Sequence, residues 1–421
     1  MHKAPTTRSV HDVRACAWHR SKGLRCRSKR NTEILSVIHV TCVASRDPHA
    51  WCDRTLDNAN ITEEQLRAHF PALEIVPWLP NFYAIPSSTP LVTNELYARG
   101  HIFGMEASSG YAVSVLDVQP GDHVLDLCCA PGAKLTMLAD VLQKRGSVTG
   151  VDFSKSRISA CKALVHKYNL IHVPSPSKLE SQTPTPVTAW RCRLFHADGR
   201  TFQVLPLSND ASSAMETILD TAEITARSAK SHARKRVNKS ARARLAKLAK
   251  DMPSESDRCA TEIGDLDGTG TNTLYDKVLV DAECTHDGSL RHLVKMTTEV
   301  DWNKYLDKYL SPAHVQAILD LQHDLIRNGF RLLKEGGRMV YSTCSLSRKQ
   351  NEDIVEAFLR DEPTAKLEAF DTLNVPHQPG FLDRTIRFTP LENMGGLFVS
   401  LFSKSKPTKR QKTDSWTPAA T

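Results

Sequence analysis

The sequence predicts an α/β fold in which helices cover both faces of a mostly parallel sheet with one antiparallel strand, preceded by a small N-terminal module. Short apolar segments alternate with helical segments after the turn dipeptide Pro120–Gly121, the alternation that is typical of parallel sheets. The apolar segment Phe398–Phe402 comes last and predicts the antiparallel strand. Because 421 residues exceed one average domain, we expect one large domain with appendages.

The elements of the large domain follow one another in a regular order. A helix is expected before Pro120–Gly121. The predicted strands are His123–Leu127, Ser147–Val151, Trp190–Phe195, Lys277–Val280 and Arg338–Ser342. The predicted helices are Ala133–Lys144, Ser154–Tyr168, a long one from about His314 to Leu333, and one that begins near Arg348.

The appendages differ from this domain in composition. We expect residues 1–31 to form a disordered basic N-terminus and residues 32–100 a module with a helix at Thr62–Phe70. The large domain would span 101–405, and a disordered basic tail 406–421.

Two segments interrupt the strand–helix alternation. The proline-rich stretch at about 172–188 and the long polar stretch at about 208–272 are expected to be insertions.

Charge and composition exclude several classes of protein. The net charge is +8, and from 226 to 250 every charged residue is Lys or Arg, which indicates contact with a polyanion. No apolar run reaches the roughly 18 residues of a membrane span, which disfavours an integral membrane protein. The 11 cysteines form no Cys-x-x-Cys pair and no secretory signal is visible, so we expect free thiols and no metal.

The segment Cys128–Lys134 predicts a loop that holds an adenosine-bearing cofactor. Gly132 allows a ligand to approach the backbone, and the following helix offers free N–H groups. Asp152 ends the second strand, where it would bind ribose hydroxyls, and Asp198 ends the third, where it would flank adenine. The glycine pattern is not Gly-x-Gly-x-x-Gly, which disfavours a dinucleotide and favours S-adenosylmethionine. Alternatively, Asp152 only caps the helix that starts at Ser154.

Two cysteines follow predicted strands. A lone cysteine at a strand end is usually a small buried side chain. Cys284 and Cys344, however, lie in loops that the strand order would bring together, which favours thiol chemistry. A thiol protease is disfavoured because no histidine–asparagine context accompanies either cysteine.

Three segments, Asp126–Lys134, Asp281–Cys284 and Tyr341–Glu352, resemble motifs of the NOP/Sun (RsmB/NOP-type) RNA cytosine-C5 methyltransferases. The resemblance runs from about Tyr97 to Lys404 without the insertions. It implies a Rossmann-like S-adenosylmethionine-dependent methyltransferase fold that acts on rRNA or tRNA. The residues that would line the cofactor site by this resemblance are Cys128, Cys129, Ala130, Pro131, Gly132, Ala133, Lys134, Asp152, Arg157, Asp198 and Asp281.

The same resemblance implies roles for four residues. Cys344 would be the nucleophile that adds to carbon 6 of cytosine, and Cys284 would assist its release. Asp281 would hydrogen-bond ring N3. Lys134 would help to lower the pKa of the Cys344 thiol.

One departure from the family pattern concerns the first thiol motif. Glu283 stands where the motif usually has proline, and the residues Thr285–Ser289 also differ. We expect Glu283 to make the loop more flexible and to raise the pKa of Cys284. It also favours a second hypothesis, a catalytically weak or inactive RNA-binding or ribosome-assembly factor. A third is methylation of a protein.

The basic segments lead to expectations about partners and location. Residues 226–250 would clamp RNA phosphates near the site; the alternative is a nuclear-import signal or a spacer. We expect a monomer. The basic tail favours the nucleus or nucleolus and rRNA over tRNA, whereas the Arg- and Ser-rich N-terminus also resembles a mitochondrial presequence.

Overall fold

The computed structural model describes residues 35–40, 61–86, 88–171, 190–208, 215–224, 273–289, 293, 298–390 and 394–406, with only the backbone for 35–40. The expected disordered termini, the proline-rich insertion, the basic segment 226–250 and most of the second insertion lie outside these residues. Among the described helices, none has the length and apolar character needed to cross a membrane.

A parallel sheet forms the centre of the large domain. Its strands are β5 (His123–Asp126), β6 (Ser147–Asp152), β7 (Arg191–His196), β9 (Tyr275–Asp281) and β10 (Leu333–Thr343). They lie in the order β10-β9-β5-β6-β7, all parallel, so all five predicted strands are present. β14 (Leu397–Lys404) runs antiparallel to β10, which confirms the predicted antiparallel strand and the fold class.

Short strands that the sequence did not predict extend both edges of this sheet. β8 (Glu216–Asp220) pairs antiparallel with β7, so part of the second expected insertion belongs to the sheet. Beside β14 lie β11 (Ala365–Glu368) and β13 (Ile386–Phe388), and β13 pairs with β12 (Gln378–Pro379). β8, β11 and β12 bury few large apolar side chains, which leaves them a weak sequence signal, whereas β13 is buried but only three residues long.

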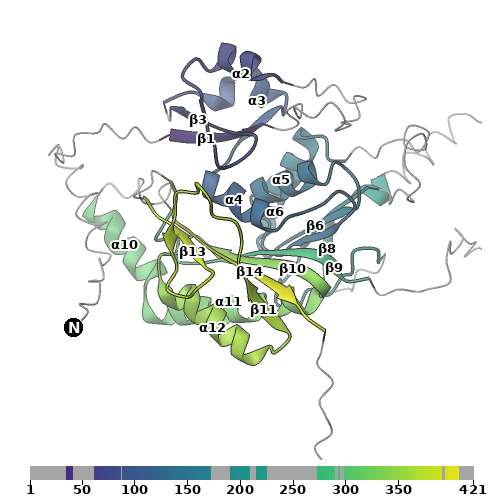
Figure 1. The fold of residues 1–421 in the computed structure, drawn as a ribbon, viewed down its shortest axis with the longest axis vertical. Helices are drawn as coiled ribbons and strands as arrows, with labels where there is room; N and C mark the ends of the chain where they lie inside the picture. Colours follow the sequence, from purple (N-terminus) through teal and green to yellow (C-terminus); the bar gives the residue numbers. More distant parts are fainter. Residues whose placement is uncertain are drawn as a thin grey trace, which may run out of the picture.

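Helices cover both faces of the sheet. α4 (Ala107–Val115), α5 (Ala133–Val141) and α6 (Lys155–Lys167) lie on one face, and α11 (Pro312–Leu332) and α12 (Glu352–Asp361) on the other (Figure 1). A short helix, η3 (Arg348–Gln350), precedes α12, and α10 (Glu299–Tyr309) precedes α11.

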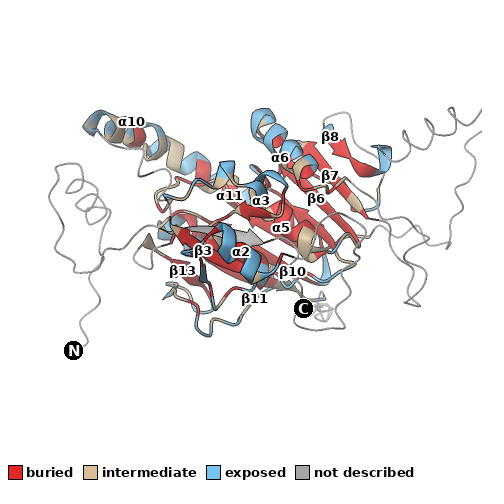
Figure 2. Ribbon diagram, turned by 90° about the horizontal axis from the view of Figure 1, so that it is seen from above, coloured by how far each residue is buried: buried red, intermediate tan, exposed pale blue. Residues whose placement is uncertain are grey.

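The residues that the covering helices bury against the sheet recur at helical spacing in the sequence. On α6 the buried residues Ile158, Cys161 and Val165 recur at helical intervals. Figure 2 shows the buried strands of the sheet between helices whose outer faces are exposed.

The N-terminal module is a small sheet with its own core. β1 (Leu35–Val40), β2 (Glu74–Ile75), β3 (Phe82–Pro86) and β4 (Ile102–Gly104) pair antiparallel in the order β2-β3-β1-β4. With them lie α2 (Glu63–His69), η1 (Leu91–Thr93) and α3 (Glu95–Ala98).

Two contacts fix the start of α2 and the attachment of the module to the large domain. Thr62 caps α2 in a reciprocal capping box with Gln65, as its position predicted. The Trp78 ring stacks on Phe388 with centroids 6.2 Å apart and meets Tyr111 edge-on, which joins the module to the large domain.

Candidate active site

The carboxyl ends of the parallel strands place the predicted site residues along one edge of the sheet. Asp126 ends β5, Asp152 ends β6 and Asp281 ends β9. Asp281 stands opposite Ser342 in the parallel register of β9 and β10. The loops that follow these two strands, which carry Cys284 and Cys344, therefore emerge side by side.

The structure brings the two cysteines into contact. Their Sγ atoms lie 3.2 Å apart, with Cys284 buried and Cys344 partly exposed. Gly288 fixes the distance between the loops, because its N–H donates to the Cys344 carbonyl at 3.0 Å. A Cβ at position 288 would lie 2.5 Å from that oxygen, so only glycine fits there.

His286 is a site residue that the sequence reasoning missed. Its Nδ1 lies 3.2 Å from Cys344 Sγ and 3.8 Å from Cys284 Sγ, and its Nε2 lies 3.0 Å from Glu283 Oε1. The expectation that neither cysteine has a histidine near it was therefore wrong. The signal in the sequence was the position of His286, only two residues beyond Cys284.

These contacts shift the pKa values of the three groups. The hydrogen bond from Cys284 lowers the pKa of Cys344 to about 6, against the effect of burial and together with His286. Burial opposes the charged form of His286, yet its bonds to Cys344 and Glu283 raise its pKa to about 10. The pKa of Cys284 is raised well above its ordinary value, first by the bond to Cys344 and then by burial.

Of two expectations about the causes of these shifts, the one for Glu283 needs correction, and the one for Lys134 concerns a smaller electrostatic effect. Glu283 was expected to raise the pKa of Cys284, but its carboxylate faces His286 and Arg157 instead. Lys134 was expected to lower the pKa of Cys344. Its ammonium is bound by Asp281 at 2.7 Å, and the larger effects on Cys344 come from Cys284 and His286.

Lys134 and Asp281 form an ion pair beside the thiols. The second oxygen of Asp281 accepts a hydrogen bond from Ser342 Oγ at 2.7 Å. Burial disfavours the Lys134 ammonium, but Asp281 raises the pKa of Lys134 above its ordinary value. The carboxylate therefore has two ordered hydrogen-bonding neighbours, Lys134 and Ser342, and stays partly exposed.

Buried polar side chains hold the thiol loops in place. Gln322 Nε2 donates to the Glu283 carbonyl and Tyr305 Oη to the Thr285 carbonyl, each at 2.8 Å. Asn351 Nδ2 donates to the Ser345 carbonyl at 2.9 Å. The loop conformation thus depends on residues of α10, α11 and the segment before α12.

The loop Cys128–Lys134 is fastened to the end of β6. Asp152 accepts hydrogen bonds from Ala130 N at 3.1 Å and from Ser154 N at 2.9 Å. Ser154 itself caps α6, so Asp152 does more than cap a helix, and each of its oxygens keeps a second acceptor position. Gly132 has φ of +110°, a conformation that favours glycine at the start of α5.

Arg157 connects the cofactor loop with the first thiol loop. Its guanidinium donates to the Ala130 carbonyl at 2.7 Å and to Glu283 at 3.1 Å, and lies 3.8 Å from Asp152. It therefore contacts the predicted cofactor loop from its place on α6.

Of the other predicted cofactor residues, Asp198 and Cys128 lie at the edge of the sheet, whereas the Cys129 side chain does not. Asp198 follows β7 and binds Arg200, which lowers the pKa of Asp198. Cys128 is partly buried in the loop, whereas the Cys129 thiol points into the core, 3.9 Å from Cys161 Sγ. Cys129 was expected to line the site, but its side chain packs under α6 instead.

Two features of this edge lack the partners that a bound ligand would supply. Both carboxylate oxygens of Asp126 are buried without a hydrogen-bond partner among the described residues. Burial and the nearby Asp281 raise the pKa of Asp126 to about 8. Phe153, directly after Asp152, is 75% exposed. A cationic group near Asp126 and a flat ring against Phe153 would satisfy both, which fits S-adenosylmethionine.

The ligand atoms of Cys284, His286 and Cys344 lie within 4.8 Å of one another. Such a spacing would suit a soft metal ion, but a bound metal would occupy the Cys344 sulfur, the atom expected to act as the nucleophile. We therefore do not assign a metal to this group.

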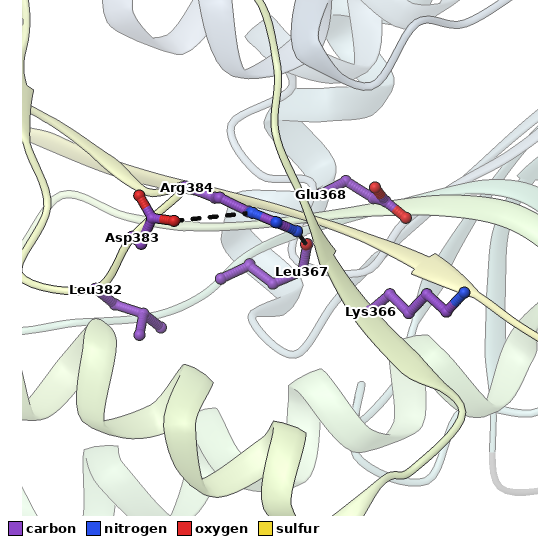
Figure 3. A pocket seen from close by; sticks show the side chains of 6 residues that line it. All are labelled: Lys366, Leu367, Glu368, Leu382, Asp383 and Arg384. Carbon is purple, nitrogen blue, oxygen red and sulfur yellow. Dashed lines mark hydrogen bonds and ion pairs between the residues drawn. The ribbon is translucent and has the colours of Figure 1, made fainter.

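A hollow of about 440 Å³ lies elsewhere on the large domain (Figure 3). It is lined by Lys366, Leu367, Glu368, Leu382, Asp383 and Arg384. The Arg384 side chain crosses it and donates to the Leu367 carbonyl at 3.0 Å. None of the predicted site residues lines it, so we give it no role in the chemistry.

Comparisons with known proteins agree with this geometry. A model of the family described as 16S rRNA methyltransferase RsmB/F matches residues 113–177 and 211–403, more than half of the chain. A Drosophila melanogaster tRNA (cytosine(34)-C(5))-methyltransferase is 26% identical over 73% of this chain and 33% of its own length. A Mus musculus 28S rRNA (cytosine-C(5))-methyltransferase is 22% identical over 81% of this chain and 56% of its own.

The chain thus spans between one third and just over half of these curated relatives. Among solved structures, that of PH0851 superposes with a TM-score of 0.55 at 22% identity, over 96% of this chain and 70% of that one. A methyltransferase homolog from Pyrococcus horikoshii gives 0.51 at 18% identity, over 88% and 87%. These likenesses concern the fold.

Proposed function

The chain belongs to the RsmB/F methyltransferase family, and from that premise we propose that it transfers a methyl group from S-adenosylmethionine to carbon 5 of cytosine in RNA. The observation that carries the proposal is the contact of Cys344 and Cys284, whose sulfur atoms lie 3.2 Å apart beside the Lys134–Asp281 pair. Few other reactions use two free thiols from separate loops at the edge of a cofactor cleft.

The cofactor would lie along the ends of β5, β6 and β7. The residues that we propose to hold it are the loop Cys128–Lys134 together with Asp126, Asp152, Phe153, Arg157, Asp198 and Asp281. When bound, S-adenosylmethionine supplies a methyl group carried on a positively charged sulfur. The buried Asp126 carboxyl group has no hydrogen-bond partner among the described residues, and a cationic ligand nearby would favour its ionised form.

Cys344 is the proposed nucleophile. Its thiolate adds to carbon 6 of the cytosine, and the electrons of the ring double bond move towards carbon 5, which becomes able to accept a methyl group. Asp281 is the carboxyl group that we propose to lie at ring N3, where the Lys134 ammonium offsets charge that moves into the ring.

Release of the product requires that the covalent bond between Cys344 and carbon 6 of the cytosine breaks. A base takes the proton of carbon 5, the bond between sulfur and carbon 6 breaks so that Cys344 leaves as a thiolate, and the ring double bond is restored. Cys284, in contact with Cys344, is placed to assist this step. Because its pKa is raised, Cys284 begins the cycle as a neutral thiol.

The structure bears on the rival hypothesis of a catalytically weak or inactive binding factor. That hypothesis came from Glu283, which stands at the position of a usual proline. Glu283 bonds to His286 and Arg157 and leaves both thiols in contact, so we propose an active enzyme.

The RNA substrate and the cellular location of the protein are proposed from the sequence. We propose rRNA ahead of tRNA, and the nucleus or nucleolus ahead of the mitochondrion, on the basic segments of the sequence. The N-terminal module would guide the RNA, and residues 226–250 would contact its phosphates. We propose that the protein acts as a monomer.

Bisulfite mapping tests the proposed function. Cellular RNA would be incubated with S-adenosylmethionine and either the wild-type protein or Cys344→Ser. We expect new 5-methylcytosine at defined positions with the wild type and none with the variant. Product formation that survives Cys344→Ser, or no new 5-methylcytosine in rRNA or tRNA, would refute the proposal.

A further inference from the structure

Glu283, His286 and Cys344 form a continuous chain of contacts. The two ring nitrogens of His286 face different partners, with Nε2 3.0 Å from Glu283 Oε1 and Nδ1 3.2 Å from Cys344 Sγ. A carboxylate only accepts hydrogen bonds, so it selects the tautomer with the proton on Nε2. The lone pair of Nδ1 then points at the thiol.

We propose that His286 is the base that takes the proton of Cys344 and that Glu283 is the residue that positions it. The S–H bond of Cys344 breaks, an N–H bond forms at Nδ1, and a thiolate remains beside an imidazolium. No electrons are exchanged with any other group. When the cytosine adduct is eliminated, the sulfur leaves as a thiolate and the ion pair forms again.

The backbone conformation of His286 is unfavourable for a residue with a side chain, which indicates that its geometry serves a function. His286 has φ of +56°, in the left-handed region that costs energy for a residue with a side chain. Glycine would adopt this conformation without cost. The strained conformation directs the imidazole back from the loop towards the sulfur atoms.

The surroundings of Glu283 hold the chain in one arrangement. Arg157 pairs with its other oxygen, Oε2, at 3.1 Å, and Gln322 fixes its backbone carbonyl. The carboxylate therefore bonds to Arg157 on one side and to His286 on the other. A carboxylate that orients an imidazole, which in turn faces a nucleophile, is the general arrangement of an activated nucleophile.

Cys284 Sγ lies 3.8 Å from His286 Nδ1 and 3.2 Å from Cys344 Sγ, and the other charged or titratable groups near His286 have further contacts of their own. Asp287 accepts hydrogen bonds from Thr285 Oγ1 at 2.6 Å and from Leu346 N at 3.0 Å. Tyr309 on α10 meets the imidazole edge-on, with ring centroids 6.4 Å apart. Lys134 is bound by Asp281. Among the described residues that contact Cys344, His286 is thus the cationic group that faces its sulfur.

The reactivity of Cys344 without RNA tests this inference. It rests on the proposed function for its purpose, but the test does not depend on methylation. The full-length protein would be treated with iodoacetamide over a range of pH in the presence of a chelator, and alkylation of each cysteine followed by peptide mass spectrometry. The compared variants are His286→Gln and Glu283→Gln. The matched control is His323→Gln, which removes an imidazole paired with Asp361 instead of a thiol.

We expect the alkylation midpoint of Cys344 in His286→Gln to rise by about one to two pH units, because a neighbouring cation is lost. At pH 7 this corresponds to a reaction roughly two- to tenfold slower, because the wild-type thiol, with a pKa of about 6, is mostly ionised there. Glu283→Gln should move the midpoint in the same direction by less, since glutamine still accepts one hydrogen bond. His323→Gln should leave it unchanged, and added imidazole should partly restore the reactivity of His286→Gly.

Several outcomes would overturn the inference. One is a wild-type midpoint in both His286→Gln and Glu283→Gln, with folding verified by circular dichroism. Another is an equal shift in His323→Gln. If the midpoint of the wild-type protein differs with and without the chelator, a bound metal and not the imidazole sets the reactivity of Cys344. If the midpoints shift as expected but no RNA is methylated, the inference stands and the proposed function fails.

Discussion

Thr285 and Gln350 exchange two hydrogen bonds. Thr285 N donates to Gln350 Oε1 at 3.1 Å, and Gln350 Nε2 donates to Thr285 Oγ1 at 2.8 Å. Gln350 lies shortly after Cys344 in the chain and Thr285 directly after Cys284. This buried amide therefore sets the distance between the loops that carry the two thiols.

Replacement of Gln350 by alanine should disturb both stability and catalysis. Thr285 N would lose its partner in a buried position, at a cost of about 1–3 kcal/mol in the free energy of unfolding. We expect a lower kcat for methyl transfer with little change in the affinity for S-adenosylmethionine, because most of the proposed cofactor residues lie at the ends of β5, β6 and β7. Urea unfolding and single-turnover assays would measure the two effects. Gln316→Ala, which removes an exposed bond to Asp320, is the control and should change neither.

Cys284→Ala should accumulate a covalent complex between the protein and RNA. Without the helper thiol, addition by Cys344 continues, whereas elimination of the product slows. A denaturing gel run after incubation with RNA and cofactor should show a slower band that disappears in the double variant with Cys344→Ser. A band of equal strength in the double variant would contradict the assignment of the two cysteines.

Methyl transfer should depend on pH through Cys344. The reactive form is the thiolate, and the pKa of Cys344 is lowered to about 6, so kcat/KM should rise with pH through that region and then level off. Since the hydrogen bond from Cys284 is the largest cause of the lowered pKa, Cys284→Ala should move the acid limb to higher pH. Initial rates of methyl incorporation at constant ionic strength would measure this. An acid limb at the same pH in the wild type and in the variant would show that another group controls the rate.

Arg387→Ala should strongly destabilise the protein. Arg387 forms an ion pair with Glu352, whose side chain is fully buried, and Arg387 Nη1 also donates to the Leu346 carbonyl at 2.9 Å. Removal of one partner leaves a buried charge without compensation, which costs about 3–5 kcal/mol. Urea unfolding would report the loss, and the double variant Glu352→Gln with Arg387→Met should recover part of it. Arg348→Ala, which breaks an exposed pair with Asp353, should cause no measurable change.

Phe153→Ala should weaken binding of S-adenosylmethionine. We propose that the exposed Phe153 ring covers the adenine, and an aromatic pair of this kind contributes about 0.5–1.5 kcal/mol. The dissociation constant measured by calorimetry should therefore rise roughly two- to tenfold. Phe381→Ala removes another exposed phenylalanine away from the cleft and should not change it. Equal affinities for the wild type and Phe153→Ala would remove Phe153 from the proposed cofactor site.

The parallel core of the fold was predictable because its strands are short apolar runs with clear turns around them. β5 and β6 are buried throughout, and Thr62 and Ser154 mark the starts of their helices with side-chain caps. β8 was missed because Leu219 is the only large apolar side chain that it buries. Its buried Asp220 is stabilised by an ion pair with Arg191 of β7, a contact between separate segments that a local pattern does not reveal.

In the candidate site, too, local sequence patterns predicted some contacts, whereas contacts between separate segments could not be predicted. Cys284, Cys344, Asp281 and Lys134 could be placed near one another because the strand order fixes which loops are neighbours. The partners of Glu283 could not, since they depend on the positive φ of His286 and on the reach of Arg157 from α6. Both features arise only when three loops are folded together.

The pairing of β14 with β10 has a consequence for the order of events during synthesis. Ser342 and Thr343, directly before Cys344, stand opposite Val399 and Phe398 in the antiparallel register. The strand that leads to Cys344 therefore lacks one neighbour until the ribosome has released residues near 400. A nascent chain that already carries both cysteines would still have an incomplete sheet around them until translation has passed β14.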